Sequence, residues 1–214
     1  MSQSPTQTRD ARERIQHAAH QLFAERGPDE VTMSEVAVAA GVARATVFNH
    51  FGSKRALIES MTEGVLDLYH DLLENALADD ERSTVSKVKH LFVVMGYGIE
   101  AERRFHRSVF REIAKLSLGL DEGGPGAAAR RRNHVAMARL LASGQARGEI
   151  SKSHSPDALA SAFASLVTGT ITHWLYDDDS HPLRERMRDA ASIFLTPVAT
   201  EQGEQSARAT GALS

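Results

Sequence analysis

The stretch that decides the fold is GVARATVFNHFGSK, residues 41–54. It begins with a glycine turn and ends on Phe-Gly-Ser-Lys, which leaves room for one short helix over residues 43–51. At about 100° per residue, Ala43, Val47 and Phe51 fall on one side of this helix, and we expect that side to face a core. The remaining positions carry small, polar and aromatic side chains: Arg44, Ala45, Thr46, Phe48 and Asn49, with His50 on the flank.

The residues before this stretch predict two further helices. Thr32-Met-Ser-Glu35 has the spacing of a capping box, so a helix is expected from about Met33 to Ala40. Upstream, apolar residues at helical spacing predict a first helix that ends at Gly27-Pro28. Two short helices joined by a tight turn at Gly41 form a helix-turn-helix.

The chain after residue 54 reads as helical throughout, with no strand pattern and no internal repeat. We therefore predict an all-α fold, with an N-terminal three-helix helix-turn-helix domain and a C-terminal helical domain. The expected divisions are a flexible N-terminus over 1–10, the helix-turn-helix domain over 11–56, the helical domain over 57–197 and a disordered tail over 198–214.

Composition limits the possible classes of protein. The 214 residues are 42% hydrophobic, which is enough for one large or two modest domains. The absence of cysteine excludes disulfides, thiolate metal sites and a cysteine nucleophile. Residues 1–14 show no signal peptide, so a cytoplasmic location is expected. The net charge is −3, and residues 1–60 hold seven basic and seven acidic side chains, so nucleic-acid binding must rest on local geometry.

The segment 158–176 contains no Asp, Glu, Lys or Arg. Its several Ser and Thr residues and its length favour a buried helix over a membrane span, so no membrane partner is expected. One stripe of this helix is bulky and a second stripe is small, with Ser161, Ser165 and Gly169. Such a helix suits packing between its own core and a partner helix, although burial within one subunit is an alternative.

The outer side of the short helix suits a DNA duplex. Arg44 and Asn49 are the residue types that contact guanine and adenine edges in pairs of hydrogen bonds. Thr46 is able to reach a phosphate or a thymine methyl group. Phe48 suits contact with a sugar or a thymine methyl group. Lys54 opens the next helix, where its charge is favourable only beside an anion such as phosphate.

Residues 11–60 resemble the DNA-binding domain of TetR-type (TetR/AcrR-like) transcriptional regulators. The family pattern is Thr-x-x-x-Ile/Val-Ala-x-x-Ala-Gly-Val-Ser-x-x-Thr-Leu-Tyr-x-His-Phe-x-Ser-Lys-x-x-Leu. This chain follows it from Thr32 through Val36-Ala37, Ala40-Gly41-Val42, Thr46, His50-Phe51 and Ser53-Lys54 to Leu57. Ala43 stands where the family usually has Ser, which weakens the cap of the recognition helix. Phe48 stands where Tyr is usual, so a phenol hydrogen bond to phosphate is missing.

The resemblance implies a DNA-binding transcriptional regulator that is not an enzyme and needs no cofactor. It implies a homodimeric repressor that binds a palindromic operator in double-stranded DNA and is released by a small-molecule effector. By this resemblance, Arg44, Ala45, Thr46 and Asn49 would face base edges in the major groove. The residues that would hold the DNA backbone are Thr32, Phe48, His50 and Lys54.

The same resemblance implies a dimer interface and a ligand pocket in the helical domain. The last two helices would form the interface, with Ser161, Ser165, Gly169, Met187, Ala191 and Phe194 as candidates. The pocket would lie among the middle helices, with His173 and Trp174 as its most promising polar groups. The other pocket candidates are Phe92, Met95, Tyr97, Phe110, His134, Met137 and Thr170.

Three alternatives remain open. Gly96-x-Gly98-x-x-Ala101 follows a strand-like run and matches a dinucleotide fingerprint, but the apolar residues around it keep helical phase. A second alternative is a helical adaptor whose helix-turn-helix does not bind DNA. The acidic residues 177–179 together with His181 have ligand types that suit a cation, although we expect a solvated loop there and no metal site.

Overall fold

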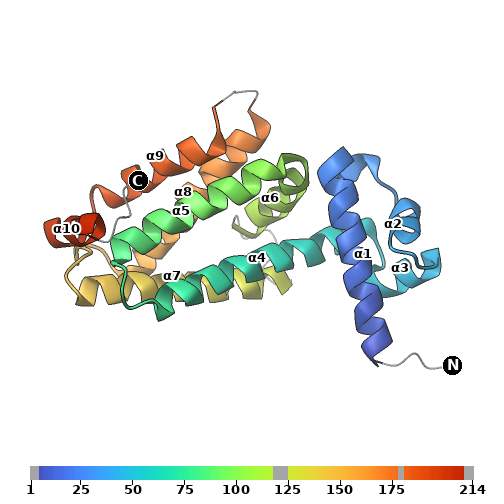
Figure 1. Cartoon of the computed structure of the whole chain (residues 1–214), viewed down its shortest axis with the longest axis horizontal. Helices are drawn as coiled ribbons and strands as arrows, with labels where there is room; N and C mark the ends of the chain where they lie inside the picture. The colour runs from blue at the N-terminus through green and yellow to red at the C-terminus, as the bar shows by residue number, and fades with distance from the viewer. Residues whose placement is uncertain (1–4, 118–124, 178–180, 210–214) are drawn as a thin grey trace.

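The structure is a computed structural model that describes residues 5–117, 125–177 and 181–209. Within these ranges the regular elements are ten α-helices and one 3-10 helix, and the only β-type pairing is an isolated bridge between Ile150 and Ala199. The predicted all-α class is therefore confirmed. Figure 1 shows an elongated molecule, with the first helices at one end and a larger helical bundle at the other.

The smaller end is built from four elements: α1 (Pro5–Arg26), the 3-10 helix η1 (Pro28–Glu30), α2 (Met33–Ala39) and α3 (Arg44–Phe51). Their apolar side chains recur at helical spacing and meet in one core, in which Ile15 and Phe23 of α1 are buried with Val47 and Phe51 of α3. The inward direction predicted for Val47 and Phe51 is confirmed. Ala43 is exposed instead, because it is the N-cap of α3 and lies ahead of the first helical turn.

The larger bundle contains seven helices of the described chain, and α4 connects it to the smaller end (Figure 1). α4 runs without a break past residues 56 and 57, so a continuous helix stands where a domain boundary was expected. α4 packs against α7, α5 packs against α9, and α8 contacts α6, α7 and α9. These helices are α4 (Lys54–Ala78), α5 (Thr84–Ala101), α6 (Arg103–Ser117), α7 (Pro125–Ala146), α8 (Pro156–Tyr176), α9 (Leu183–Leu195) and α10 (Glu201–Ala209).

Serine and threonine side chains cap the start of several helices, and the predicted capping box at Thr32 is one of them. Glu35 N–H donates to Thr32 Oγ1 at 3.2 Å, and Thr32 N–H donates to the Glu35 carboxylate at 2.8 Å, which completes the capping box of α2. Ser53 and Ser155 cap α4 and α8 through their hydroxyl oxygens. α3 has no such cap, because the side chain of Ala43 offers no acceptor for its first amides.

The disordered tail predicted over 198–214 is wrong where the structure describes it. α10 packs against α5 there, and its Gly203 and Ala207 are buried. A Cβ on Gly203 would lie 2.4 Å from the carbonyl oxygen of Glu149. The small residues that suggested disorder therefore permit close packing against the end of α7. Residues 210–214 lie outside the described ranges.

The flexible N-terminus predicted over 1–10 is also wrong in part. α1 begins at Pro5, so residues 5–10 are already helical, while residues 1–4 lie outside the described ranges. Proline is compatible with this position because the first turn of a helix does not use its N–H groups in intrahelical hydrogen bonds.

α5 is continuous through Gly96 and Gly98, which contradicts the strand and turn that a dinucleotide fingerprint requires. Gly96 serves packing instead. A Cβ at this position would lie 3.1 Å from Cα of Arg184, so the glycine allows α9 to approach the backbone of α5.

α8 is the one helix of the described residues that is long and apolar enough to cross a membrane by composition. In the fold it is a central helix of the bundle. Leu159, Phe163 and Ile171 are buried, and α6, α7 and α9 pack around it. The bulky stripe of segment 158–176 is therefore buried as predicted, while the stripe of small residues with Ser161, Ser165 and Gly169 is exposed.

Candidate functional site

The turn between α2 and α3 directs one side of α3 outward. Gly41 has a φ of 64°, a left-handed conformation that glycine adopts without steric cost. Val42 N–H donates to the carbonyl of Ala37 at 3.0 Å and closes the turn. Because Val47 and Phe51 are buried on the inner side, the opposite side of α3 is presented to the surroundings.

That outer side carries the side chains expected to read DNA. Arg44, Ala45 and Asn49 are exposed, Thr46 is half-buried, and Phe48 is 36% exposed. The Arg44 guanidinium carbon lies 5.4 Å from the centroid of the Phe48 ring, within the range of a cation–π contact. Arg44 forms no ion pair with another described residue, so its donors remain available to an external acceptor.

Lys54 has an intramolecular role that the sequence did not indicate. Its ammonium group donates to the carbonyl oxygens of Pro28 at 2.7 Å and Val31 at 3.1 Å. These oxygens supply the negative partial charge that a lysine in the first turn of a helix needs. Lys54 therefore ties the start of α4 to η1 and to the residue that follows it.

Thr32 and His50 are also engaged within the chain. The Thr32 hydroxyl donates to Glu35 Oε2 at 2.8 Å, so it belongs to the capping box of α2. Hydrogen bonds from Arg26 and Thr32 lower the pKa of Glu35 to about 2. His50 is half-buried, and its carbonyl accepts a hydrogen bond from Arg12 Nη1 at 3.5 Å.

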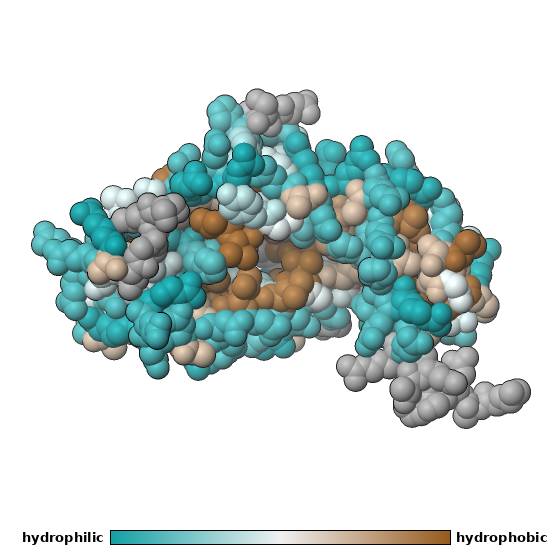
Figure 2. Space-filling view, viewed as in Figure 1, coloured by the Kyte–Doolittle hydropathy of each residue, from teal (hydrophilic) through white to brown (hydrophobic). Residues whose placement is uncertain are grey.

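A second candidate site is a cavity of about 1070 Å³ inside the larger bundle. Its wall comes mainly from α4, α5, α6, α7 and α8. Figure 2 shows a hollow with apolar side chains around it in the middle of the molecule. The wall also includes Gln16, His17 and His20 of α1, so the cavity reaches the helix-turn-helix domain.

Four of the predicted pocket residues line this cavity. They are Met95 of α5, Phe110 of α6, and His134 and Met137 of α7. His134 Nε2 lies 2.6 Å from the carboxylate of Asp157, so its ring is held at the edge of α8.

The other five candidates do not line the cavity. Phe92 is fully buried, with its ring 4.8 Å from that of Phe163. Trp174 donates its indole N–H to the carbonyl of His181 at 3.1 Å, and Arg103 lies over its ring. The remaining three lie on sides of α5 and α8 that do not face the cavity. Tyr97 and His173 are exposed, and Thr170 is half-buried.

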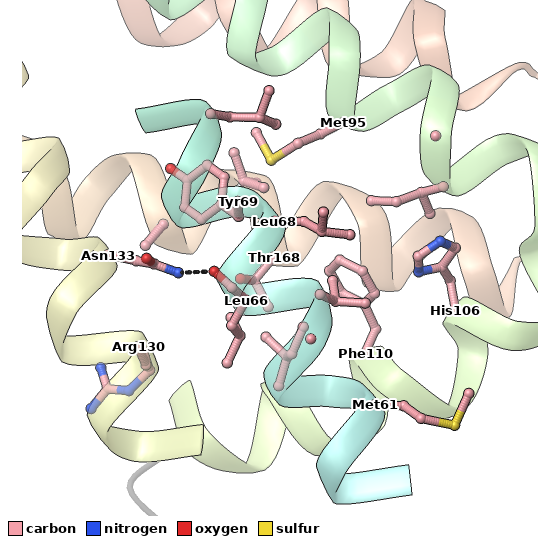
Figure 3. Close-up of a pocket in the computed structure, with 18 of the residues that line it drawn as sticks. Met61, Leu66, Leu68, Tyr69, Met95, His106, Phe110, Arg130, Asn133 and Thr168 are labelled. Carbon is pink, nitrogen blue, oxygen red and sulfur yellow. Dashed lines mark hydrogen bonds between the residues drawn. The ribbon is translucent and has the colours of Figure 1, made fainter. Parts of the chain in front are cut away.

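Sequence reasoning missed several polar residues of the wall, among them Tyr69 of α4, His106 of α6 and Asn133 of α7 (Figure 3). Burial by the surrounding protein raises the pKa of the Tyr69 phenol, which stays neutral. Asn133 Nδ2 donates to the carbonyl of Leu66 at 2.8 Å. A signal for Asn133 does exist, because it interrupts the apolar stripe of α7 four residues before Met137.

His106 lies where the cavity meets the helix-turn-helix domain. Burial and the neighbouring His20 lower the pKa of His106 to about 4, so its imidazole is neutral near pH 7. His20 Nε2 lies 2.8 Å from Glu102 Oε2, and its ring packs at 4.5 Å on Phe105. α1 thus contacts the larger bundle through a polar pair and a ring contact beside the cavity.

The predicted dimer candidates divide into two groups. Ser161, Ser165 and Gly169 are exposed along α8, and the two serines also border the cavity. Met187, Ala191 and Phe194 are buried inside the chain, so they are not available to a partner subunit and this part of the prediction is wrong. The reason is that α9 uses its apolar stripe to pack against α5 and α8 of its own chain.

Within the described residues no group of three or more His, Asp or Glu side chains is placed to hold a metal ion. Asp178 and Asp179 of the possible cation loop lie outside the described ranges.

The comparisons with known proteins agree with this geometry. Residues 15–61 match the family described as bacterial regulatory proteins, tetR family. The chain is 22% identical over 179 residues to the HTH-type transcriptional regulator TtgR of Pseudomonas putida, and the match covers 81% of this chain and 84% of that protein.

Two solved structures extend the likeness to the whole fold. FadR of Thermus thermophilus, a TetR family transcriptional repressor in complex with lauroyl-CoA, is 27% identical with a TM-score of 0.66, over 86% of this chain and 93% of that chain. SmeT of Stenotrophomonas maltophilia, in complex with triclosan, is 20% identical with a TM-score of 0.66, over 89% and 92% of the two chains. The helix-turn-helix over residues 15–61 therefore matches the DNA-binding domain of the tetR family of bacterial regulatory proteins, and the helical bundle shares the fold of TetR-family structures.

Proposed function

We propose that the protein is a homodimeric repressor that binds a palindromic operator and is released from it by a small molecule. The observation that carries this proposal is the outer side of α3. Arg44, Ala45 and Asn49 are exposed there on a helix that Val47 and Phe51 anchor in the core. A rigid helix with free guanidinium and amide groups suits base edges in the major groove.

The other predicted DNA contacts take different parts in this proposal. Phe48 lies under Arg44 and limits the directions open to its guanidinium, so it suits a positioning role as well as contact with the duplex. Thr46 and His50 are half-buried at the borders of the helix and suit contacts with phosphate or sugar. Thr32 and Lys54 support the proposal chiefly by holding α2 and α4 in place.

A dimer is supported by the exposed side of α8. Ala158, Ala162, Ser165 and Gly169 leave a strip of small side chains along this helix, which allows close approach of a second helix. Ile193 of the neighbouring α9 is 66% exposed and adds an apolar contact. Two copies joined here by a two-fold axis would present their α3 helices to half-sites about 34–36 Å apart.

Release by a small molecule is supported by the position of the cavity. Its wall includes residues of α1, so a ligand would contact the helix-turn-helix domain as well as the bundle. The FadR and SmeT structures hold lauroyl-CoA and triclosan, so chains of this fold bind molecules that have a large apolar part. A ligand that binds better to one relative position of α1 and α6 would shift the population away from DNA binding.

The test is selection of bound DNA from a random duplex pool at near-physiological salt, which suppresses nonspecific phosphate binding. We expect enrichment of a palindrome whose half-sites lie about one helical turn apart. An Arg44→Ala variant carried through the same selection should enrich the palindrome more weakly and lose the base preference at the position that Arg44 contacts.

The second candidate function is a helical adaptor that does not read DNA. It predicts that wild type and Arg44→Ala both enrich no sequence.

We propose that the protein acts by binding rather than by catalysis, and that it acts in the cytoplasm, where the DNA is accessible.

A further inference from the structure

The cavity wall is apolar for most of its extent. Met61, Leu68, Met95 and Phe110 lie around its centre in Figure 3, and Leu68 is 67% exposed although it belongs to the bundle. Methionine side chains adapt to the shape of an apolar ligand. Walls of this kind contribute affinity through apolar contact and leave specificity to the few polar groups among them.

Three of the titratable groups of the described wall are already paired within the chain. His20 is paired with Glu102, and His134 is paired with Asp157. Arg130 also lines the cavity, and its Nε is buried without a hydrogen-bond partner, but Figure 3 shows its guanidinium directed away from the other labelled side chains. A charged ligand group placed in the apolar centre, beside Met95 and Phe110, would lose its hydration without gaining a partner of opposite charge.

Asn133 is the polar group of the wall that restricts the chemistry of the ligand most. Its side chain is 5% exposed, and Nδ2 already donates to the carbonyl of Leu66. Oδ1 is buried without a hydrogen-bond partner. This contact also fixes the orientation of the amide, since exchanging the two atoms would set Oδ1 against another carbonyl oxygen. Asn133 Oδ1 therefore lacks a hydrogen-bond donor.

Neighbouring groups place this acceptor at one end of the cavity. Leu66 and Tyr69 are three residues apart on α4, so the Tyr69 hydroxyl lies on the same side of that helix as the Asn133 contact. His106 lies at the opposite side of the cavity in Figure 3, with Leu68 and Phe110 between. His106 Nδ1 is also buried without a partner. The wall is thus apolar in the middle and has uncharged polar groups at both sides.

We propose that this cavity binds an uncharged, largely apolar molecule carrying a hydroxyl or N–H donor that Asn133 Oδ1 accepts. Because Oδ1 is covered by its neighbours, the donor reaches it with a small side-chain shift of the kind that accompanies binding in many proteins. The proposal deepens the regulatory function given above and rests on it for the role of the molecule as an effector.

The test compares four probes that share one ten-carbon chain and differ at one end: decan-1-ol, 1-methoxydecane, decanoate and decylammonium. Binding to the full-length protein without DNA is measured by calorimetry at pH 7, below the concentrations at which the probes aggregate. We expect decan-1-ol to bind about tenfold more tightly than the ether, which lacks the donor. We expect it to exceed both ions by at least about a hundredfold.

The Asn133→Leu variant tests the assignment to one side chain. We expect it to bind decan-1-ol and 1-methoxydecane with equal affinity. Asn75→Leu is the matched control, because Asn75 is exposed on α4 outside the cavity wall, and it should keep the preference for the alcohol. Thermal unfolding establishes that both variants are folded. The ranking of the four probes on the wild-type protein tests the ligand class even if Asn133→Leu does not fold.

Equal binding of alcohol and ether by the wild type would overturn the donor requirement. Tightest binding of decanoate or decylammonium would assign the cavity to a charged ligand, and binding of none of the four would remove this class altogether. Retention of the alcohol preference in a folded Asn133→Leu protein would overturn the role of Asn133. These measurements contain no DNA. Their outcome is therefore independent of the operator selection that tests the proposed function.

Discussion

Arg44 is where the proposed DNA reading depends on a single side chain. Its guanidinium is exposed over the Phe48 ring, and the backbone beneath it is held by the buried side of α3. A stacked guanidinium loses less freedom on binding than one that moves freely in water. The position of Arg44 therefore suits a contact that discriminates between bases.

We expect Arg44→Ala to weaken binding to the selected operator by about 1–3 kcal/mol, because a paired contact to one base would be lost. Fluorescence anisotropy with labelled duplex measures this change. Arg139→Ala is the control, since Arg139 is an exposed arginine of α7 and its loss changes the net charge equally. If the two variants lose the same affinity, Arg44 contributes only charge and does not read a base.

Lys54 shows how a residue with an expected DNA role can serve the fold. We expect Lys54→Met to lower the free energy of unfolding by about 1–2 kcal/mol, because the carbonyls of Pro28 and Val31 lose a charged donor. Urea unfolding measures this, with Lys152→Met as the control at an exposed turn. Unchanged stability together with weaker operator binding would instead assign Lys54 to a phosphate.

The recognition helix α3 is the least supported element of the helix-turn-helix. α2 and α4 begin with side-chain caps, but the side chain of Ala43 offers no acceptor to the first amides of α3. Its eight residues are too few for an isolated helix to be stable in water. Packing of Val47 and Phe51 against the other helices must therefore supply most of its stability.

Ala43→Ser should stabilise the protein by about 1 kcal/mol, because Ala43 already has the extended backbone of an N-cap, with φ −67° and ψ 147°. Thermal and urea unfolding measure the gain. Ala45→Ser is the matched control inside the helix, where serine should cost up to about 0.5 kcal/mol. A stabilisation of equal size at both positions would show that the gain does not come from capping.

Across the whole molecule, α6 joins the helix-turn-helix domain to the bundle. Arg104 donates to the carbonyl of Glu25 near the end of α1. Arg103 donates to the carbonyls of Trp174 at 2.7 Å and Asp177 at 2.6 Å at the end of α8. Two adjacent residues therefore connect α6 to helices of both parts. A movement of α6 would change the position of α1 relative to α8.

His106 lies one turn further along α6 and should make the stability of the molecule depend on pH. Its pKa is about 4 in the folded protein and 6.5 in a free side chain, so the unfolded chain binds more protons between these values. Stability should therefore be fully present above pH 6.5 and fall by roughly 2–3 kcal/mol as the pH drops to 4.

Urea unfolding at a series of pH values measures this dependence. His106→Phe should flatten the curve between pH 6.5 and 4, while His154→Phe at an exposed position should leave it unchanged. The carboxylates with lowered pKa, Glu35 and Asp79, lose their contribution mainly below pH 4.5 and remain in both variants. A curve for His106→Phe that follows the wild type would show that the pKa of His106 is the same in the folded and the unfolded protein.

The sequence by itself determined the helix-turn-helix, because its signals are local. The capping box spans three residues, the turn needs one glycine at Gly41, and the direction of Val47 and Phe51 follows from the helical repeat. The end of the first helix at Gly27-Pro28 followed for the same reason. The tail was misread because small residues are compatible both with disorder and with the close packing of Gly203.

Only the tertiary structure decided which side chains face the cavity and which face a partner. An apolar stripe has the same pattern whether it meets a core, a cavity or another subunit, so the sequence could not separate Met95 from Phe92 or Gly169 from Phe194. The contacts of Lys54 and the unpaired oxygen of Asn133 depend on segments far apart in the chain. The rotation of each helix is set by the packing of its neighbours, and that packing brings the distant residues together.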